Sequence, residues 1–371
     1  MKKSIFFLEG MMIAMLLSAC GSKDVNNIEE NREIQDTIEN EPIEKEAMPE
    51  ETGWNENRIE DSLCDNVIVD ADVVVPEGFQ GVAAVYNAGI QYFQEEAVMG
   101  VFGVEKEHTT NPAEGLYQYE GQTFGFANSV AGNFYYYSKT GDSYKVFNPY
   151  NISECANMEN LGEGKDLDFM SAEEAGNKVL GTLSDMGIDN AIILHTYALP
   201  VEYHKYQEEE EVENGYLMES ERLGEQWDVL GGCYELELTT CYDNIPLYEE
   251  GYVAADDSAF NGGKIKAIIS KNGIEKLEIP NQYVRNDTVI EAEPVLSPDE
   301  ILQYLKIKME NIILTDTYTV KKVRLCYLPS VVNKGEGLFQ LIPIWEITLN
   351  GETDGDVVYL FQANDGVEIQ W

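Results

Sequence analysis

Two stretches of the 371-residue chain carry the same helix-starting signal, and strand-like segments follow each of them. Residues 171–174 read Ser-Ala-Glu-Glu, and residues 297–300 read Ser-Pro-Asp-Glu. A serine three residues before a glutamate is typical of a capping box, in which the serine oxygen accepts a bond from an exposed backbone N–H and the glutamate reaches back. We therefore expect helices after Ser171 and Ser297, the second with proline at its favoured first position. These helix starts restrict the fold to one that alternates helices with groups of strands.

The segments after each helix predict strands by their alternating or β-branched character. The expected strands are 188–199, 232–242, 264–269 and 273–279 after the first helix, and 317–328, 337–349 and 356–362 after the second. Ile-Pro-Leu-Tyr at 245–248 matches Ile-Pro-Ile-Trp at 342–345, and the turn at 271–274 matches that at 364–367. We interpret this order as a tandem α-β-β-β duplication with an acidic insertion near 200–231 in the first copy. The alternative is two similar helices that arose by chance.

The region before the first helix is rich in strand signals. Residues 67–75 form a β-branched run that ends at Pro76, and glycines divide residues 116–147 into short hairpins. Residues 86–98 place apolar side chains at helical spacing, so we expect a short helix there. In the tyrosine run 135–137, alternation places Tyr136 on the face opposite its two neighbours. The predicted fold class is α+β, with mostly antiparallel sheets, few helices and tandem units after an N-terminal β-rich region.

The first 20 residues have the features of an export signal. Lys2 and Lys3 precede an apolar stretch, interrupted by Glu9, that is too short to span a bilayer. Leu-Ser-Ala-Cys-Gly then follows at 17–21 and resembles the bacterial lipobox. That resemblance implies cleavage before Cys20 and acylation of its thiol, and two or three acyl chains would anchor the protein stably. The alternative is an ordinary secretory signal with a chance cysteine.

An acidic segment follows the lipobox. Residues 21–61 contain 14 acidic and 4 basic residues, with almost no aromatic ones. Such a segment buries too little apolar surface to offset its ordering entropy, so we expect a disordered, extended tether, with a weak helix near 28–38 as the alternative. The predicted organisation is a signal peptide, the tether, a β-rich region, a first unit and a second unit, at residues 1–19, 20–61, 62–165, 166–280 and 281–371.

Charge limits the partners. The chain has 24 basic and 68 acidic residues and a net charge of −44. Such a field repels nucleic-acid backbones and anionic membrane surfaces, so we expect no nucleic-acid partner and contact with the membrane only through the lipid anchor. Cations, basic peptides or a cationic protein patch fit the charge better.

The cysteines and histidines indicate no metal or redox centre. Five cysteines remain besides Cys20, and no two form a CxxC pair, so buried free thiols are expected at Cys64, Cys155, Cys233, Cys241 and Cys326. Cys233 and Cys241 lie in one predicted strand, roughly 26 Å apart and too far for a bridge. We assign no metal and no cofactor.

The three histidines are His108, His195 and His204. Each could act as a base or a ligand, but none belongs to an HExxH arrangement. His195 lies in an apolar strand-like run, which favours a core or cross-strand role. His204 precedes the acidic run 208–211, which favours a solvated loop, with a weak divalent-cation site as the alternative. The alternating polar residues between Asn350 and Asp356 resemble a calcium loop but lack its distant glutamate, and a polar hairpin turn explains them as well.

The residues 171–174, the strands after them, the Pro-Ile-Trp strand at 343–345 and the terminal Asn-Asp-Gly at 364–366 resemble PepSY-like modules. They also resemble the C-terminal parts of the YycH/YycI regulators of envelope histidine kinases, and the whole plan resembles uncharacterised lipoproteins of Firmicutes. The resemblance covers residues 166–371. It implies an extracytoplasmic, non-catalytic α+β module that binds or restrains a peptidase or a sensor, and it supplies no catalytic residue. One departure is that those regulators carry an N-terminal transmembrane helix.

A search for chemistry finds no phosphate loop, nucleophile elbow or dinucleotide fingerprint. The leading hypothesis is therefore a lipid-anchored binding or regulatory protein, without enzymatic activity, on the outer face of the membrane of a Gram-positive bacterium. One alternative is a secreted hydrolase that uses paired carboxylates on glycan or peptide. A second alternative is a solute-binding lipoprotein, although those alternate strands and helices more regularly.

Overall fold

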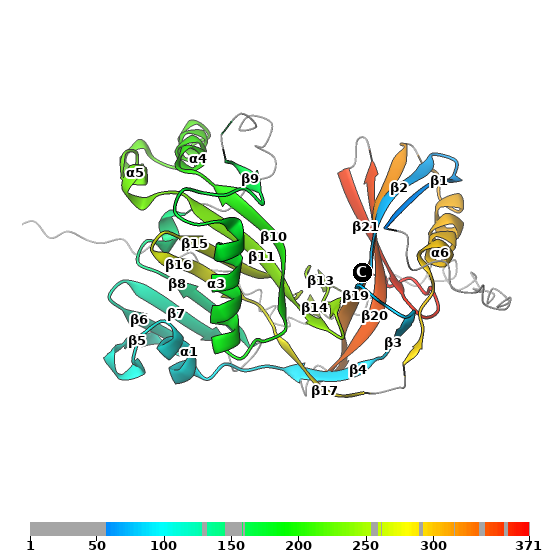
Figure 1. Cartoon of the computed structure of the whole chain (residues 1–371), viewed down its shortest axis with the longest axis horizontal. Helices are drawn as coiled ribbons and strands as arrows, with labels where there is room; N and C mark the ends of the chain where they lie inside the picture. The colour runs from blue at the N-terminus through cyan, green and yellow to red at the C-terminus, as the bar shows by residue number, and fades with distance from the viewer. Residues whose placement is uncertain are drawn as a thin grey trace, which may run out of the picture. The chain divides into compact units, whose positions relative to one another are not determined.

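The computed structural model describes residues 57–127, 132–144, 158, 160–253, 259–260, 262–288, 292–314, 316–333, 338–351 and 355–370. The predicted leader, Cys20 and most of the tether lie outside these residues, as does Cys155. Among the described helices, none is both long enough and apolar enough to cross a bilayer. The described residues form an α+β fold with mostly antiparallel sheets, as predicted (Figure 1).

The larger sheet has ten strands and is antiparallel throughout. Its order is β5-β6-β7-β8-β16-β15-β11-β10-β9, with β12 paired to β11. The bounds are β5 Thr110–Ala113, β6 Leu116–Tyr119, β7 Gln122–Ala127, β8 Asn133–Tyr137, β9 Gly162–Glu163, β10 Ala191–Leu199, β11 Cys233–Tyr242, β12 Ile245–Pro246, β15 Ile265–Ser270 and β16 Gly273–Ile279.

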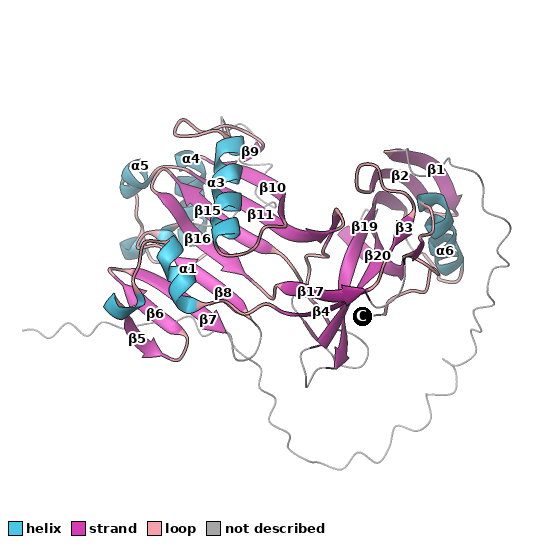
Figure 2. Cartoon of the chain, turned by 60° about the horizontal axis from the view of Figure 1, so that its bottom comes forward, coloured by secondary structure: helices cyan, strands magenta, loops and turns pink. Residues whose placement is uncertain are grey.

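Helices cover both faces of this sheet (Figure 2). On one face, α3 (Ala172–Asp185) packs Val179 and Leu183 against Tyr234 and Leu236 of β11, and α1 (Glu95–Val101) lies on the same core. On the other face, α4 (Val201–Glu213) and α5 (Gln226–Leu230) cover Cys233 of β11. Because both of its faces are covered, β11 is buried along most of its length. The acidic insertion predicted at 200–231 thus forms the second cover.

The second sheet has seven strands in the order β1-β2-β19-β20-β4-β17, with β21 paired to β20. Its parallel pair joins β2 to β19, two strands that are far apart in the sequence. Its helix, α6 (Pro298–Glu310), packs Ile301 and Leu305 into the core of this sheet. The bounds are β1 Arg58–Cys64, β2 Val67–Val74, β4 Tyr86–Ile90, β17 Tyr283–Thr288, β19 Tyr318–Asn333, β20 Leu338–Gly351 and β21 Gly355–Gln362.

Short elements complete the described structure. Two minor ladders pair β13 (Tyr252–Val253) with β14 (Ala259–Phe260), and β3 (Val82–Ala83) with β18 (Glu293–Pro294). The 3-10 turns are η1 (Lys106–His108), η2 (Gly141–Ser143) and η4 (Glu219–Glu221). The loop from β12 joins the smaller sheet through a bridge between Leu247 and Tyr327.

Both predicted helix starts are confirmed. Ser297 Oγ accepts from the N–H of Glu300 (3.3 Å), and Glu300 Oε2 accepts from the N–H of Ser297 (2.6 Å), which completes the box. Ser171 Oγ accepts from the N–H of Glu174 (3.1 Å), so α3 has its serine cap. Gly187 follows the last turn of α3 with φ +89°, a conformation that glycine adopts without strain.

Two expectations need correction. The helix predicted over 86–98 is wrong, because Tyr86–Ile90 is strand β4 and the helix begins only at Glu95. Ile245 and Pro246 form the short arm of a hairpin on β11, whereas Ile342 and Pro343 lie inside β20, so these two motifs are not equivalent.

The strands of the predicted β-rich region 62–165 are divided between the two sheets. Strands β1, β2 and β4 belong to the seven-stranded sheet, and β5 to β8 belong to the ten-stranded one.

Candidate functional site

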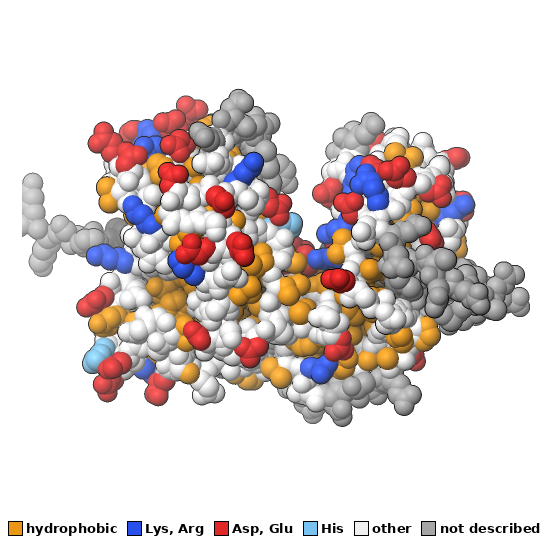
Figure 3. Space-filling view, in the orientation of Figure 1, with side chains coloured by type: hydrophobic (Ala, Val, Ile, Leu, Met, Phe, Trp, Pro, Cys, Tyr) orange, Lys and Arg blue, Asp and Glu red, His pale blue; other side chains and the backbone are white. Residues whose placement is uncertain are grey.

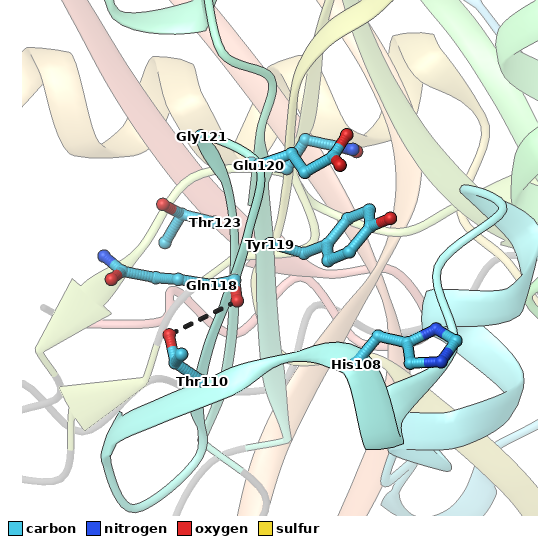
Figure 4. A pocket seen from close by; sticks show the side chains of 8 residues that line it. His108, Thr110, Gln118, Tyr119, Glu120, Gly121 and Thr123 are labelled. Carbon is cyan, nitrogen blue, oxygen red and sulfur yellow. Dashed lines mark hydrogen bonds between the residues drawn. The ribbon is translucent and has the colours of Figure 1, made fainter.

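An open pocket of about 510 Å³ lies at the β5 edge of the ten-stranded sheet (Figure 4). Its residues come from η1, β5 and the β6–β7 hairpin. They are His108, Thr110, Gln118, Tyr119, Glu120, Gly121, Gln122 and Thr123. The volume falls in the range of small-molecule sites. An aromatic ring, an imidazole, hydroxyls and amides line it, so the pocket offers stacking and hydrogen bonding.

The tight turn between β6 and β7 shapes this pocket. Glu120 (φ +48°) and Gly121 (φ +91°) both have positive φ, as a two-residue hairpin turn of the primed type requires. The turn pairs Tyr119 with Gln122 and Gln118 with Thr123. It therefore presents neighbouring aromatic and amide side chains at one sheet edge.

Hydrogen bonds fix the pocket wall. Buried Tyr136 of β8 donates from Oη to Gln122 Oε1 (3.0 Å) and orients that amide. Thr110 Oγ1 donates to the carbonyl of Gln118 (3.4 Å), the bond drawn in Figure 4. Tyr119, between Gln118 and Glu120, is half-buried.

An ion pair holds η1, which carries His108, against the sheet. Lys106 Nζ and Tyr117 Oη each donate to Glu95 Oε2 at 2.6 Å, which links η1 to α1 and β6. Burial acts to raise the pKa of Glu95, but the bonds from Lys106 and Tyr117 outweigh it and lower that pKa. The Glu95 carboxylate therefore stays charged and anchors the turn.

Two glutamates flank His108. His108 Nδ1 lies 3.3 Å from Glu105 Oε2, and its Nε2 lies 3.9 Å from Glu107 Oε1. One ligand atom from each of the three residues falls within 4.8 Å of the others, and carboxylate and imidazole groups suit divalent cations. All three side chains are exposed, and their neighbouring positions on one 3-10 turn account for their approach without a metal ion.

His195 has the cross-strand role that the sequence predicts. Its Nδ1 lies 2.8 Å from Glu163 Oε1 of β9, and its ring stacks on Tyr197 at 5.6 Å between centroids. The side chain is half-exposed. We infer that the contact between His195 and Glu163 helps to hold the short strand β9 against β10.

His204 occupies a different environment from either of its predicted ones. It lies in α4 with no exposed surface, stacked on Trp227 at 4.6 Å, and its Nε2 is 3.4 Å from Cys233 Sγ. Burial lowers the pKa of His204 to about 3 and raises the pKa of the Cys233 thiol well above its usual value. Both groups are neutral at pH 7, so this thiol–imidazole pair does not supply a thiolate in the closed structure. Neither the solvated loop nor the cation site predicted for His204 is present.

The cysteines in the described residues are free thiols, as predicted, but only Cys233 and Cys326 are buried, whereas Cys64 and Cys241 are half-buried. Cys64, Cys233, Cys241 and Cys326 are unpaired, and Cys233 and Cys241 lie at opposite ends of β11. Burial raises the pKa of each of these thiols. They are therefore poor nucleophiles at neutral pH.

Two smaller predictions concern aromatic and polar residues. Tyr136 is buried while Tyr135 and Tyr137 are half-buried on the other face of β8, as alternation predicts. Asn350 Nδ2 donates to Asp356 Oδ1 (2.7 Å) across the β20–β21 hairpin, which supports the polar-turn interpretation. Residues 352–354 of the calcium-like pattern lie outside the described residues.

Buried charges form two clusters that sequence reasoning missed. Glu275 Oε1 accepts from Ser270 Oγ (2.5 Å), and its Oε2 accepts from Thr140 Oγ1 (2.8 Å) and Ser138 Oγ. Arg324 donates to Glu346 Oε2 (2.7 Å) and Glu249 Oε2 (2.6 Å). These partners come from different strands and from the loops that follow β8 and β12, so only the tertiary structure could have revealed them.

Comparisons with known proteins support the fold alone. No protein-family model matches the chain, and no curated protein matches it. The crystal structure of an uncharacterised protein from Eubacterium rectale is similar, with a TM-score of 0.60 over 85% of this chain and 94% of that chain. The two sequences are 15% identical. The shared architecture therefore extends over most of both chains but assigns no activity.

Proposed function

We propose that this chain is a lipid-anchored binding or regulatory protein, without enzymatic activity, on the outer face of the membrane of a Gram-positive bacterium. The observation that carries the proposal is the leader that ends in Leu-Ser-Ala-Cys-Gly at 17–21. Acyl chains on Cys20 would hold the protein at the membrane. The 36 residues between Cys20 and Asn57, the first described residue, would separate the folded part from the bilayer.

The charge and the element order support the same proposal. Acidic side chains gather over α4 and α5 (Figure 3), so this surface would favour cationic partners over anionic lipid. A helix followed by an antiparallel meander occurs in both sheets: α3 precedes β10, β11 and β15, and α6 precedes β19, β20 and β21. We interpret this repetition as the tandem PepSY-like plan, and the resemblance to that family implies a module that binds or restrains a peptidase or a sensor.

The pocket beside His108 is the binding site that the geometry favours most. Tyr119 offers a ring for stacking, and its cross-strand neighbour Gln122, on the same face of the hairpin, offers hydrogen bonds to a polar ligand, whereas Gln118 and Thr123 point to the other side (Figure 4). Its openness suits a ligand that passes across the sheet edge, such as an envelope glycan. The buried Cys233–His204 pair, by contrast, is inaccessible and neutral.

A glycan probe separates binding from hydrolysis. We expect an N-acetylglucosamine tetrasaccharide to bind the full-length chain and to remain uncleaved on prolonged incubation. Tyr119→Ala removes the stacking ring and should weaken binding about tenfold, since stacking on an aromatic side chain contributes on the order of 1 kcal/mol or more. Calorimetry measures the affinity, and mass spectrometry of the sugar measures cleavage.

Tyr92→Ala is the matched control, because Tyr92 is an exposed tyrosine that does not line the pocket. This variant should bind as the wild type does. If Tyr119→Ala and Tyr92→Ala weaken binding of the tetrasaccharide equally, the pocket is not its binding site. Cleavage of the sugar by the wild type, but not by a variant lacking one carboxylate, would favour the hydrolase alternative.

A further inference from the structure

The insertion at 200–231, here named the α4–α5 cap, joins two strands that are already paired. Leu199 at the end of β10 lies opposite Cys233 at the start of β11. The two ends of the cap are therefore adjacent, and the ladder between β10 and β11 continues without it. Movement of the cap away from the sheet would break no strand pairing.

The face of the cap against the sheet is mostly apolar and contains a fully buried imidazole. Tyr203 and Trp227 of the cap pack with Leu199, Cys233 and Ile268 of the sheet. His204 lies among them with no exposed surface, and its Nε2 points to Cys233 Sγ at 3.4 Å. The other ring nitrogen, Nδ1, has no hydrogen-bond partner.

Further polar atoms of the cap are also buried without partners, namely Gln207 Nε2 and Trp227 Nε1. The ion pairs of the cap are internal: Lys205 with Asp228, and Arg222 with Glu209 and Glu219. Attachment to the sheet includes the bond from Tyr144 Oη to the carbonyl of Leu230 (3.1 Å). Apolar packing thus contributes most of the attachment, and unpaired polar atoms weaken it.

The titratable groups in contact with His204 are two tyrosines and a thiol. Tyr144 and Tyr203 pack edge-on against its ring, and Cys233 lies at its Nε2. Burial raises the pKa of Tyr144 to about 12 and that of Cys233 well above its usual value, so these two groups are neutral at pH 7. No carboxylate contacts the ring in the described structure.

The surrounding charged groups already have partners. Glu208, one turn along α4, accepts from the N–H groups of Leu223 and Gly224. On the sheet, hydroxyl groups surround Glu275, Lys276 donates to the carbonyl of Tyr144 (3.2 Å), and Glu235 is buried on β11. Protonated His204 would therefore be a buried cation without a dedicated carboxylate, which is strongly unfavourable.

We propose that the α4–α5 cap is a proton-released lid, in which protonation of His204 frees the cap from the sheet and exposes the Cys233 thiol. In the released state the imidazolium reaches water, and Leu199, Ile268 and Cys233 lose their cover. The accessible thiol and the apolar floor then form a surface that is absent from the closed structure. The only chemical step is the gain of one proton by His204.

The pH range follows from the histidine. An exposed imidazole has a pKa of about 6.5, whereas burial lowers the pKa of His204 to about 3 in the closed state. The open state therefore binds more protons between these values, so closure is most stable above pH 6.5 and weakens as the pH falls toward 3. Between pH 7 and pH 5 the ratio of open to closed cap should rise by about 20-fold.

Thiol protection measures this ratio in the full-length chain. The probe is 4,4′-dithiodipyridine, which reacts with thiols in acid, and peptide mass spectrometry reports the modification of Cys233 alone. The rate of Cys233 modification in the urea-unfolded chain is divided by the rate in the native chain at the same pH. This ratio removes the pH dependence of the thiol's own reactivity. The resulting protection factor should fall by about 20-fold from pH 7 to pH 5. A protection factor that does not change would overturn the proposal.

His204→Phe keeps an aromatic ring against Trp227 but binds no proton, so its protection factor should be the same at both pH values. His195→Phe, which removes a half-exposed histidine of the same sheet, should retain the 20-fold change. If the change persists in His204→Phe, another group controls the cap and the proposal fails. Should that variant not fold, His204→Gln makes the same comparison.

Hydrogen exchange in the wild type distinguishes release of the cap from unfolding of the sheet. After correction for intrinsic exchange, the amides of α4 should lose protection from pH 7 to pH 5, while those of α3 should not. Equal losses in α3 and α4 would indicate global acid unfolding and would contradict a local lid.

Discussion

Arg324 is the residue whose removal should damage the fold most directly. It is 5% exposed and bonds both Glu346 on the neighbouring strand β20 and Glu249 in the loop after β12. Burial of a guanidinium is unfavourable by itself, so its charge depends on these two carboxylates. Glu346 also pairs with Lys322, whose Nζ lies 3.2 Å from Glu346 Oε1. The three charges join strand β19, strand β20 and a loop that arrives from the ten-stranded sheet.

We expect Arg324→Met to lower the free energy of unfolding by about 3–5 kcal/mol, because two carboxylates lose their buried cation. Urea unfolding monitored by circular dichroism measures this change. Arg58→Gln is the comparison: Arg58 pairs with Asp70 and Asp72 at an exposed site, and such pairs contribute little. A similar loss of stability in both variants would contradict the importance of the buried cluster.

For single residues, the sequence predicts a role correctly only where the neighbouring residues in the chain determine that role. The strand-like run around His195 indicated its cross-strand role. The solvated loop predicted for His204 is wrong, because the acidic run beside it does not face solvent throughout. Glu208 of that run points inward and accepts from the N–H groups of Leu223 and Gly224. The pocket at His108 is formed by β5, the β6–β7 hairpin and a 3-10 turn. No spacing of residues in the sequence predicts it.

Helix starts are the elements that the sequence predicts best. At α6 the serine and the glutamate each bond the other's N–H group, whereas at α3 only the serine cap is present. Asp166 Oδ1 provides a second acceptor at α3, for the N–H of Ala172 (2.9 Å). The two helices thus satisfy their first turns in different ways.

Ser297→Ala should lower the free energy of unfolding by about 1 kcal/mol, because it removes the acceptor for the first turn of α6. Ser171→Ala should cost less, since Asp166 still bonds the first turn of α3. Denaturant titration of the two variants measures which substitution lowers the free energy of unfolding more. A larger loss for Ser171→Ala would show that the reciprocal box contributes little here.

The missed element shows why spacing alone is insufficient. Residues 86–98 place apolar side chains at both helical and alternating intervals. The chain adopts β4 over its first part because Leu338–Leu341 of β20 and Tyr283–Thr288 of β17 provide strand partners on either side. Partners from sequence positions about 200 residues away override the local pattern.

Across the whole molecule, the order of elements could be predicted but the membership of the sheets could not. Capping boxes, glycine turns and alternation are local, so the strands after α3 and after α6 fell close to their predicted bounds. The parallel pairing of β2 with β19 depends on contacts between distant segments, and it places an N-terminal strand beside the C-terminal ones. For the same reason the predicted β-rich region 62–165 is shared between two sheets.

We propose that a lipidated thiol holds the folded part outside the cell. The test is mass spectrometry of the chain recovered from the membranes of a Gram-positive bacterium that expresses it. We predict a mature protein that begins at Cys20 and carries the mass of a diacylglyceryl group on that residue, and Cys20→Ala should abolish the modification. Recovery of the chain with residues 1–19 still attached and Cys20 unmodified would contradict the account.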